Sequence, residues 1–152
     1  MLLDFHLVPS LVGCPCGPFR GAPAFRIALF SDRISAGFPS PATDYLEPGL
    51  DLNEFLVNNK AASFLFTVTG VSMTGAGIMD GDKVIVDRSL TPRSGDIVIA
   101  ALDDEYTIKR LHFDDTGVRL VPANPRYETI TLCEGRELTI WGVVTGVVRK
   151  YR

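Results

Sequence analysis

From residue 64 to residue 150, the chain alternates short segments rich in Val, Ile and Thr with turns that contain Gly or Asp. β-Branched residues favour extended backbone, and turn residues at such intervals separate one strand from the next. The pattern predicts strands at residues 64–69, 83–87, 96–101, 105–111, 118–121, 128–132 and 138–150. We therefore expect a mostly β fold, built as a compact twisted β-sheet domain.

A short helix and a tight turn complete the expected framework. Residues 51–57 read as a helix, with Asp51 as the N-cap and Glu54 placed to reach back in a capping box. Residues 102–104 are expected to turn one strand back on the next, which would put the strand at 105–111 in a rigid hairpin.

Two residues in this framework have side chains suited to cutting a peptide bond. Ser72 falls in a loop, and Lys109 falls in a strand 37 residues later. A serine hydroxyl needs a base to take its proton, and a lysine serves as that base only when it is neutral. A free lysine has a pKa near ~10.4, so it must first be desolvated. Alternation places Lys109 on the strand face of Leu111, which favours that burial. We predict Ser72 as nucleophile and Lys109 as general base.

Each residue also has a simpler interpretation. Gly-x-Ser is common in loops, and a strand lysine is usually solvated, with its stem on apolar surface. A histidine-based triad is disfavoured, because His112 should point away from Lys109 and His6 lies near the start of the chain. Turn roles suffice for the aspartates, including Asp82, and Arg149 is expected to belong to a solvated basic tail.

The order of several segments carries a family resemblance. Residues 70–82 contain Ser72, an apolar strand follows at 84–86, Ser-Gly-Asp-Ile-Val occupies 94–98, and then comes Lys109. In this order and spacing the chain resembles the self-cleaving LexA and UmuD group of bacterial SOS-response proteins, over about three quarters of its length from residue 38 onward. The resemblance implies a fold like the LexA C-terminal domain and a serine endopeptidase with a Ser-Lys dyad.

The resemblance also implies which bond is cut. In the family the cleaved bond joins a small residue to Gly, upstream of the serine, and here that carries over to Ala36 and Gly37. Such small residues can enter a narrow cleft, and glycine frees the local backbone. We expect residues 1–36 to be a flexible N-terminal arm removed by self-cleavage, and 37–152 to be the peptidase and dimerisation domain. An ordinary linker before a Pro-rich turn is the alternative.

What the cut is for follows from the resemblance to the UmuD type. It implies a homodimer, a RecA filament on single-stranded DNA as co-protease, and a UmuC-like Y-family DNA polymerase as the partner in error-prone translesion synthesis. Prolines in the first 36 residues argue against a helix-turn-helix there, namely Pro9, Pro15, Pro18 and Pro23. The repressors of the group carry such a domain.

Composition narrows the other function classes. With 46% hydrophobic residues and a net charge of −3, the chain fits one globular domain and lacks the basic balance of a protein that binds DNA directly. No run reaches the ~18 apolar residues that span a membrane. A lipoprotein-like box ends at Cys14, but no positive charge precedes it, so we expect a cytoplasmic protein.

A metal site is also not expected. Cys14, Cys16 and His6 could be imagined as ligands, but one C-x-C pair with a single histidine is a weak signal. An odd number of cysteines instead predicts free thiols and no cofactor. Two other functions stay open: a non-catalytic adaptor of the same fold that modulates a DNA polymerase, and a protease that cuts other proteins.

Overall fold

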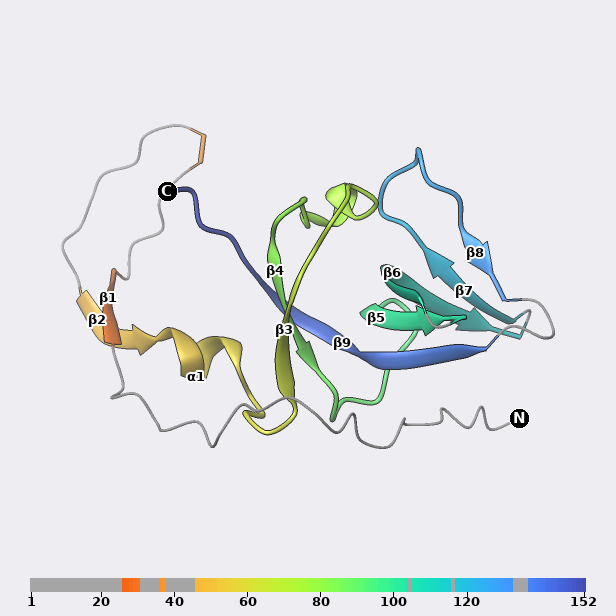
Figure 1. Ribbon diagram of the computed structural model, residues 1–152. Helices are drawn as coiled ribbons and strands as arrows, with labels where there is room; N and C mark the ends of the chain where they lie inside the picture. Colours follow the sequence, from red (N-terminus) through yellow and green to blue (C-terminus); the bar gives the residue numbers. More distant parts are fainter. Residues whose placement is uncertain (1–25, 31–35, 38–45, 104, 116, 133–136) are drawn as a thin grey trace. The chain divides into compact units, whose positions relative to one another are not determined.

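The computed structural model describes residues 26–30, 36–37, 46–103, 105–115, 117–132 and 137–152. The described residues divide into two compact units, one ending at Asn58 and the other beginning at Asn59. Figure 1 shows the chain coloured along its sequence, with the elements of both units labelled. Ser72 and Lys109 both belong to the second unit, and Ala36 and Gly37 to the first.

The first unit contains a hairpin-like pair of strands and a short helix. Strands β1 (Arg26–Phe30) and β2 (Leu46–Asp51) pair in antiparallel fashion, and α1 (Leu52–Leu56) follows directly. The Asp51 carboxylate accepts a hydrogen bond of 2.8 Å from the Asn53 N–H, so the predicted N-cap is confirmed. Neither strand was predicted, and β1 lies inside the segment expected to form the arm.

The second unit is built on one seven-stranded antiparallel sheet, with strand order β3-β4-β9-β5-β6-β7-β8. All seven predicted strands are confirmed, with ends displaced by a few residues, and so is the mostly β fold. The strands are β3 (Ser63–Thr67), β4 (Lys83–Asp87), β5 (Ile97–Leu102), β6 (Glu105–Asp114), β7 (Gly117–Val121), β8 (Ile130–Thr131) and β9 (Leu138–Val148).

Strand β9 holds the two parts of this sheet together. Its first half pairs with β5 and its second half with β4, and Val143 at the junction pairs with both Val98 and Asp87. Figure 1 shows it as the long blue strand that runs from β5 toward β3 and β4. The chain's last strand therefore ends beside the start of β4, next to the loop that carries Ser72.

The sheet has a buried cluster on each face. Successive residues of a strand point to opposite faces, so Ile99 belongs to one cluster while Val98 and Ala100 belong to the other. The first cluster consists of Val68, Met73, Ile78, Val84, Val86 and Ile99. The second consists of Val98, Ala100, Leu111, Leu120, Ile140 and Val143. Because Met73 and Ile78 come from the Ser72 loop, that loop is part of the first core.

The hairpin predicted to carry Lys109 is also confirmed. Leu102 of β5 pairs with Glu105 of β6, and Asp103 in the turn has a φ of 49°. A two-residue hairpin turn requires such left-handed backbone, which Asp tolerates better than most residues. The turn fixes the register in which Lys109 lies opposite Val98.

Candidate active site

Lys109 and Ser72 meet in the second unit. The Lys109 Nζ lies 3.0 Å from Ser72 Oγ, and it also lies 3.0 Å from Thr107 Oγ1 and 2.9 Å from the Ile108 carbonyl oxygen. Thr107 is two residues before Lys109 on β6, so alternation puts both side chains on one face. The two residues that the sequence singles out as nucleophile and base are therefore in hydrogen-bond contact.

The environment of Lys109 favours its neutral form. Its side chain is buried, with the residue 8% exposed, and this desolvation lowers the pKa of its amine. Across the part of the chain that the structure describes, no carboxylate lies within salt-bridge distance of that amine. Its hydrogen-bond partners are therefore neutral oxygens, and no opposite charge there compensates the burial of an ammonium.

The three contacts of Lys109 also suit a neutral amine. Such an amine has two N–H donors and one lone pair. In the ammonium form all three N–H groups donate, to Ser72 Oγ, Thr107 Oγ1 and the Ile108 carbonyl. In the neutral form the Ile108 carbonyl and the Thr107 hydroxyl can take the two N–H groups, which leaves the lone pair to accept the Ser72 O–H. Thr107 therefore orients the amine toward Ser72. This arrangement is able to remove a proton from the serine oxygen.

Ser72 lies in a loop that its own backbone closes. The Val68 N–H donates to the Asp82 carbonyl and the Gly81 N–H donates to the Val68 carbonyl, both at 2.8 Å. Within the loop closed by these two hydrogen bonds, the short 3₁₀ helix η1 (Thr74–Ala76) begins two residues after Ser72. The Met73 side chain, 1% exposed, points into the first core cluster and fixes the residue next to Ser72.

A second segment, the connection between β7 and β8, holds the same loop from outside. The Ala123 N–H donates to the Ser72 carbonyl at 2.9 Å, and the Ala123 carbonyl accepts from the Gly75 N–H at 2.8 Å. A Cβ on Gly75 would lie 2.1 Å from that carbonyl oxygen, so only glycine permits this approach. The Ser72 turn thus depends on residues about fifty positions further along the chain.

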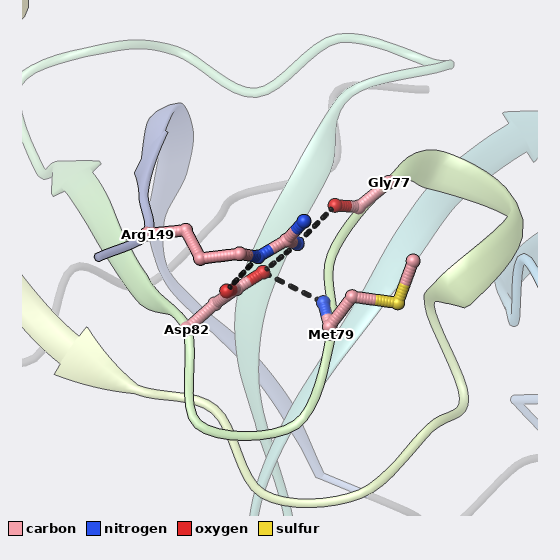
Figure 2. Close-up of polar contacts among 4 residues, drawn as sticks. All are labelled: Gly77, Met79, Asp82 and Arg149. Carbon is pink, nitrogen blue, oxygen red and sulfur yellow. Dashed lines mark hydrogen bonds and ion pairs between the residues drawn. The ribbon is translucent and has the colours of Figure 1, made fainter. Parts of the chain in front are cut away.

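Arg149, the residue that follows β9, supplies a third contact, drawn in Figure 2. The Arg149 guanidinium donates to both carboxylate oxygens of Asp82, at 2.6 and 2.5 Å, and to the Gly77 carbonyl at 2.9 Å. The Asp82 carboxylate also accepts from the Met79 N–H at 2.7 Å. Its hydrogen bonds, first with Arg149 and then with Met79, lower the pKa of Asp82 to about 2.

This ion pair corrects two expectations from the sequence. Asp82 is not merely a turn residue, because its side chain is 2% exposed and paired, and Arg149 is not part of a freely solvated tail. The two residues are 67 positions apart, and no local pattern links them. The only available signals were an aspartate at the start of a buried strand and an arginine just after another, which predict no pairing by themselves.

Ala36 and Gly37 lie in a bend of the first unit, and both are exposed. His6, Cys14 and Cys16 lie outside the described residues. Within the described ranges, no group of three His, Cys, Asp or Glu side chains could hold a metal ion. Nor does any helix in those ranges have the length and apolar character needed to cross a membrane.

Comparison with known proteins adds the family. The family model described as Peptidase S24-like matches residues 28–145. The chain is 44% identical to Protein ImpA of Salmonella typhimurium over 139 residues. This alignment covers 91% of this chain and 93% of the relative. Over 124 residues the chain is 45% identical to Protein SamA of Salmonella typhimurium strain LT2, with coverage of 82% and 86%.

The LexA repressor of Anaeromyxobacter dehalogenans is 39% identical over 137 residues, which are 88% of this chain and 60% of the repressor. These matches confirm the resemblance to the LexA and UmuD group that the order of the segments indicated. With the family model matching residues on both sides of Ser72 and Lys109, the chain belongs to the Peptidase S24-like family.

Proposed function

We propose that the chain is a self-cleaving serine endopeptidase in which Ser72 is the nucleophile, Lys109 the general base, and Ala36–Gly37 the bond that is cut. The observation that carries this proposal is the 3.0 Å contact between Ser72 Oγ and the buried Lys109 amine, whose pKa is lowered. Burying an ammonium without a counter-charge is costly, and a base that must be neutral to act explains that burial.

The reaction proceeds in two halves. Neutral Lys109 takes the Ser72 hydroxyl proton as the oxygen attacks the Ala36 carbonyl carbon. The resulting lysine ammonium then gives that proton to the Gly37 nitrogen as the C–N bond breaks, which leaves an ester between Ala36 and Ser72. Neutral Lys109 then takes a proton from water as the water oxygen attacks the ester carbonyl. The resulting ammonium returns that proton to Ser72 Oγ as the C–O bond breaks, which releases the Ala36 carboxyl group and restores the free serine.

The tetrahedral oxyanion needs hydrogen-bond donors close to Ser72. The backbone N–H groups of Ser72 and Met73 suit this role, since neither donates a hydrogen bond to any of the residues described. They stand beside the nucleophile, and the side chain of Met73 is anchored in the core. We assign the oxyanion to these two donors.

The biological role rests on the relatives. Similarity to ImpA and SamA, and the resemblance to the UmuD type, support an SOS role in which the fragment from Gly37 to Arg152 forms a homodimer. Its partner in translesion synthesis would be a UmuC-like Y-family DNA polymerase. A RecA filament on single-stranded DNA would stimulate cutting by shifting the population toward the conformer in which the bond enters the site.

The test is the intact mass of the purified protein after incubation at pH 10, and separately with RecA, single-stranded DNA and ATP. A new species that begins at Gly37 is expected in the wild type and in neither Ser72→Ala nor Lys109→Ala. An unchanged mass in every sample would contradict the proposal and leave a non-catalytic adaptor as the better interpretation. A labelled peptide spanning residues 35–40 separates self-processing from cutting of other chains.

A further inference from the structure

Both peptide groups that flank Ser72 are held by two consecutive residues of the β7–β8 connection. The Ser72 carbonyl accepts from the Ala123 N–H at 2.9 Å. The Val71 carbonyl accepts from Asn124 Nδ2 at 2.8 Å, across 53 positions of sequence. The first contact uses backbone and is open to any residue except proline, but the second requires a side chain that donates. Thr74 also donates to the Val71 carbonyl, from its hydroxyl at 3.2 Å and its N–H at 3.5 Å, so the Asn124 bond is the shortest of the three.

These two carbonyls decide where two N–H groups point. A trans peptide group is planar, so its C=O and its N–H point in opposite directions. Fixing the Val71 carbonyl therefore fixes the Ser72 N–H, and fixing the Ser72 carbonyl fixes the Met73 N–H. Both N–H groups then point away from the β7–β8 connection, and among the described residues neither has an acceptor.

We propose that Asn124 is a positioning residue for the oxyanion site: by binding the Val71 carbonyl, it aims the Ser72 N–H at the oxyanion formed on the scissile carbonyl. The inference rests on the proposed self-cleavage, because it assigns a role within that reaction. A hydrogen bond to the carbonyl of a peptide group also polarises it, which strengthens its N–H as a donor.

The Asn124 amide is itself held in one orientation. Its Oδ1 accepts from the Arg126 N–H at 3.1 Å, which leaves Nδ2 as the group that faces Val71. Replacing Asn124 with Asp keeps an acceptor for the Arg126 N–H but presents an oxygen to the Val71 carbonyl. Replacing it with Ala removes both bonds without adding a charge.

Asn59 offers a matched control. Its Oδ1 accepts from the N–H two residues later, that of Ala61, at 3.2 Å, and its Nδ2 donates to Ser89 Oγ at 3.2 Å. The local hydrogen-bond pattern is therefore the same as that of Asn124, without a contact to the Ser72 turn. Asn59→Asp makes the same chemical change outside the proposed site.

The experiment measures the self-cleavage rate constant of the full chain between pH 7 and 11, for wild type, Asn124→Ala, Asn124→Asp and Asn59→Asp. Thermal unfolding midpoints are recorded alongside. Losing a well-aimed oxyanion donor costs about a hundredfold or more in rate, so loosening one by removing its support should cost about tenfold to a hundredfold. The high-pH plateau should fall by that factor in both Asn124 variants, while Asn59→Asp keeps the wild-type rate.

The pH midpoint separates this role from an effect on the base. In Asn124→Ala the plateau should fall while the midpoint, which reports Lys109, stays where it is in the wild type. A plateau equal to that of the wild type, or a loss explained by a shifted midpoint, would overturn the inference. If Asn124→Ala is unfolded at the assay temperature, Asn124→Asp decides, with its plateau compared against Asn59→Asp. A wild type that does not cut at all overturns the proposed function, and the inference with it.

Discussion

The two partners of the candidate dyad are held in different ways. Lys109 lies in the middle of the ten-residue strand β6, whose residues 105–110 pair with β5 and whose residues 110–114 pair with β7. Ser72 lies outside every strand, in a loop whose shape depends on contacts with Ala123, Asn124 and Arg149. Lys109 is thus positioned by a repeated ladder of hydrogen bonds, and Ser72 by individual ones.

This difference predicts which of the two side chains is more easily displaced by substitutions elsewhere in the chain. Removing one bond from a paired strand leaves its neighbours to keep the register, so remote substitutions should rarely displace Lys109. The Ser72 loop has no such ladder, because its supports are separate hydrogen bonds, some within the loop and others to the β7–β8 connection and to Arg149. Substitutions far from the dyad in sequence should therefore slow cleavage mainly by moving Ser72.

The largest effect should come from the dyad itself. Ser72→Ala, Lys109→Ala and Lys109→Arg should each lower the self-cleavage rate by at least about a thousandfold, since loss of the nucleophile or of its base stops the first step. The arginine variant keeps a positive charge but never deprotonates. The measurement is the fraction cut over time, read by intact mass.

Lys83→Ala serves as the control for removing a lysine. The Lys83 amine is exposed and donates to Thr67 Oγ1 at 2.7 Å, on β4 and β3 rather than at the dyad. It should cut at the wild-type rate. Activity retained in Lys109→Arg would show that the residue acts through its charge and not as a base.

Next in size is the pH dependence. Because burial lowers the pKa of Lys109 from its ordinary 10.5, the rate should rise about tenfold per pH unit and level off below pH 10.5. Stability should follow the same group. Between the folded and unfolded pKa values the unfolded chain binds more protons, so stability rises with pH in that window.

Lys109→Met removes this titration. Because the lowered pKa of Lys109 costs the folded wild type free energy below pH 10.5, this variant should have the higher thermal unfolding midpoint at pH 7, and the advantage should shrink as the pH approaches 10.5. Calorimetric scans at several pH values check it. A midpoint lowered by Lys109→Met at all pH values would mean that the hydrogen bonds of Lys109 outweigh its desolvation.

The same contrast explains what could be predicted from the sequence. The strands, and the placement of Lys109 in one of them, could be predicted because alternation and turn spacing are local patterns. Strands β5 and β6 and the turn between them show these patterns. The pairing of Arg149 with Asp82 and of Asn124 with Val71 was not, because each joins positions more than fifty residues apart. Strands β1 and β2 were missed as well, since β2 begins sixteen residues after β1 ends and no short turn links them in the sequence.

Gly75→Ala tests how strongly cleavage depends on the Ser72 turn. The new Cβ would collide with the Ala123 carbonyl oxygen, so the Ser72 turn and the β7–β8 connection must separate. We expect unfolding free energy to fall by about 1–3 kcal/mol, as in other overpacked sites. The self-cleavage rate should fall about tenfold, as expected when a reacting group is misplaced by a fraction of an ångström.

Gly117→Ala is the matched change elsewhere. Gly117 has a φ of 124° and no atom within 4 Å of the added Cβ, so alanine brings backbone strain without a collision. Gly117→Ala should lower the unfolding free energy. At temperatures where the protein is folded, it should leave the self-cleavage rate unchanged. Equal rate losses in both variants would mean that cleavage follows global stability and not the Ser72 turn.

The smallest effect on rate should come from the ion pair at the base of the loop. Arg149→Gln removes its bonds to Asp82 and Gly77, but Met73 and Ile78 still anchor the loop, so cleavage should slow only a few-fold.

The stability of the protein should respond more clearly to Arg149→Gln than the cleavage rate does. The pKa of Asp82 is about 2 in the folded chain against an ordinary 3.8, so its contribution is present above pH 4 and is lost as the pH falls toward 2. The thermal midpoint of Arg149→Gln should therefore lie below that of the wild type at pH 6, and the gap should narrow as the pH falls through 3.8 toward 2. Since Arg149→Gln leaves a buried carboxylate without its partner, adding Asp82→Asn should recover part of the loss at pH 6. A double variant less stable than Arg149→Gln would show that Asp82 stabilises the loop through Met79 more than through Arg149.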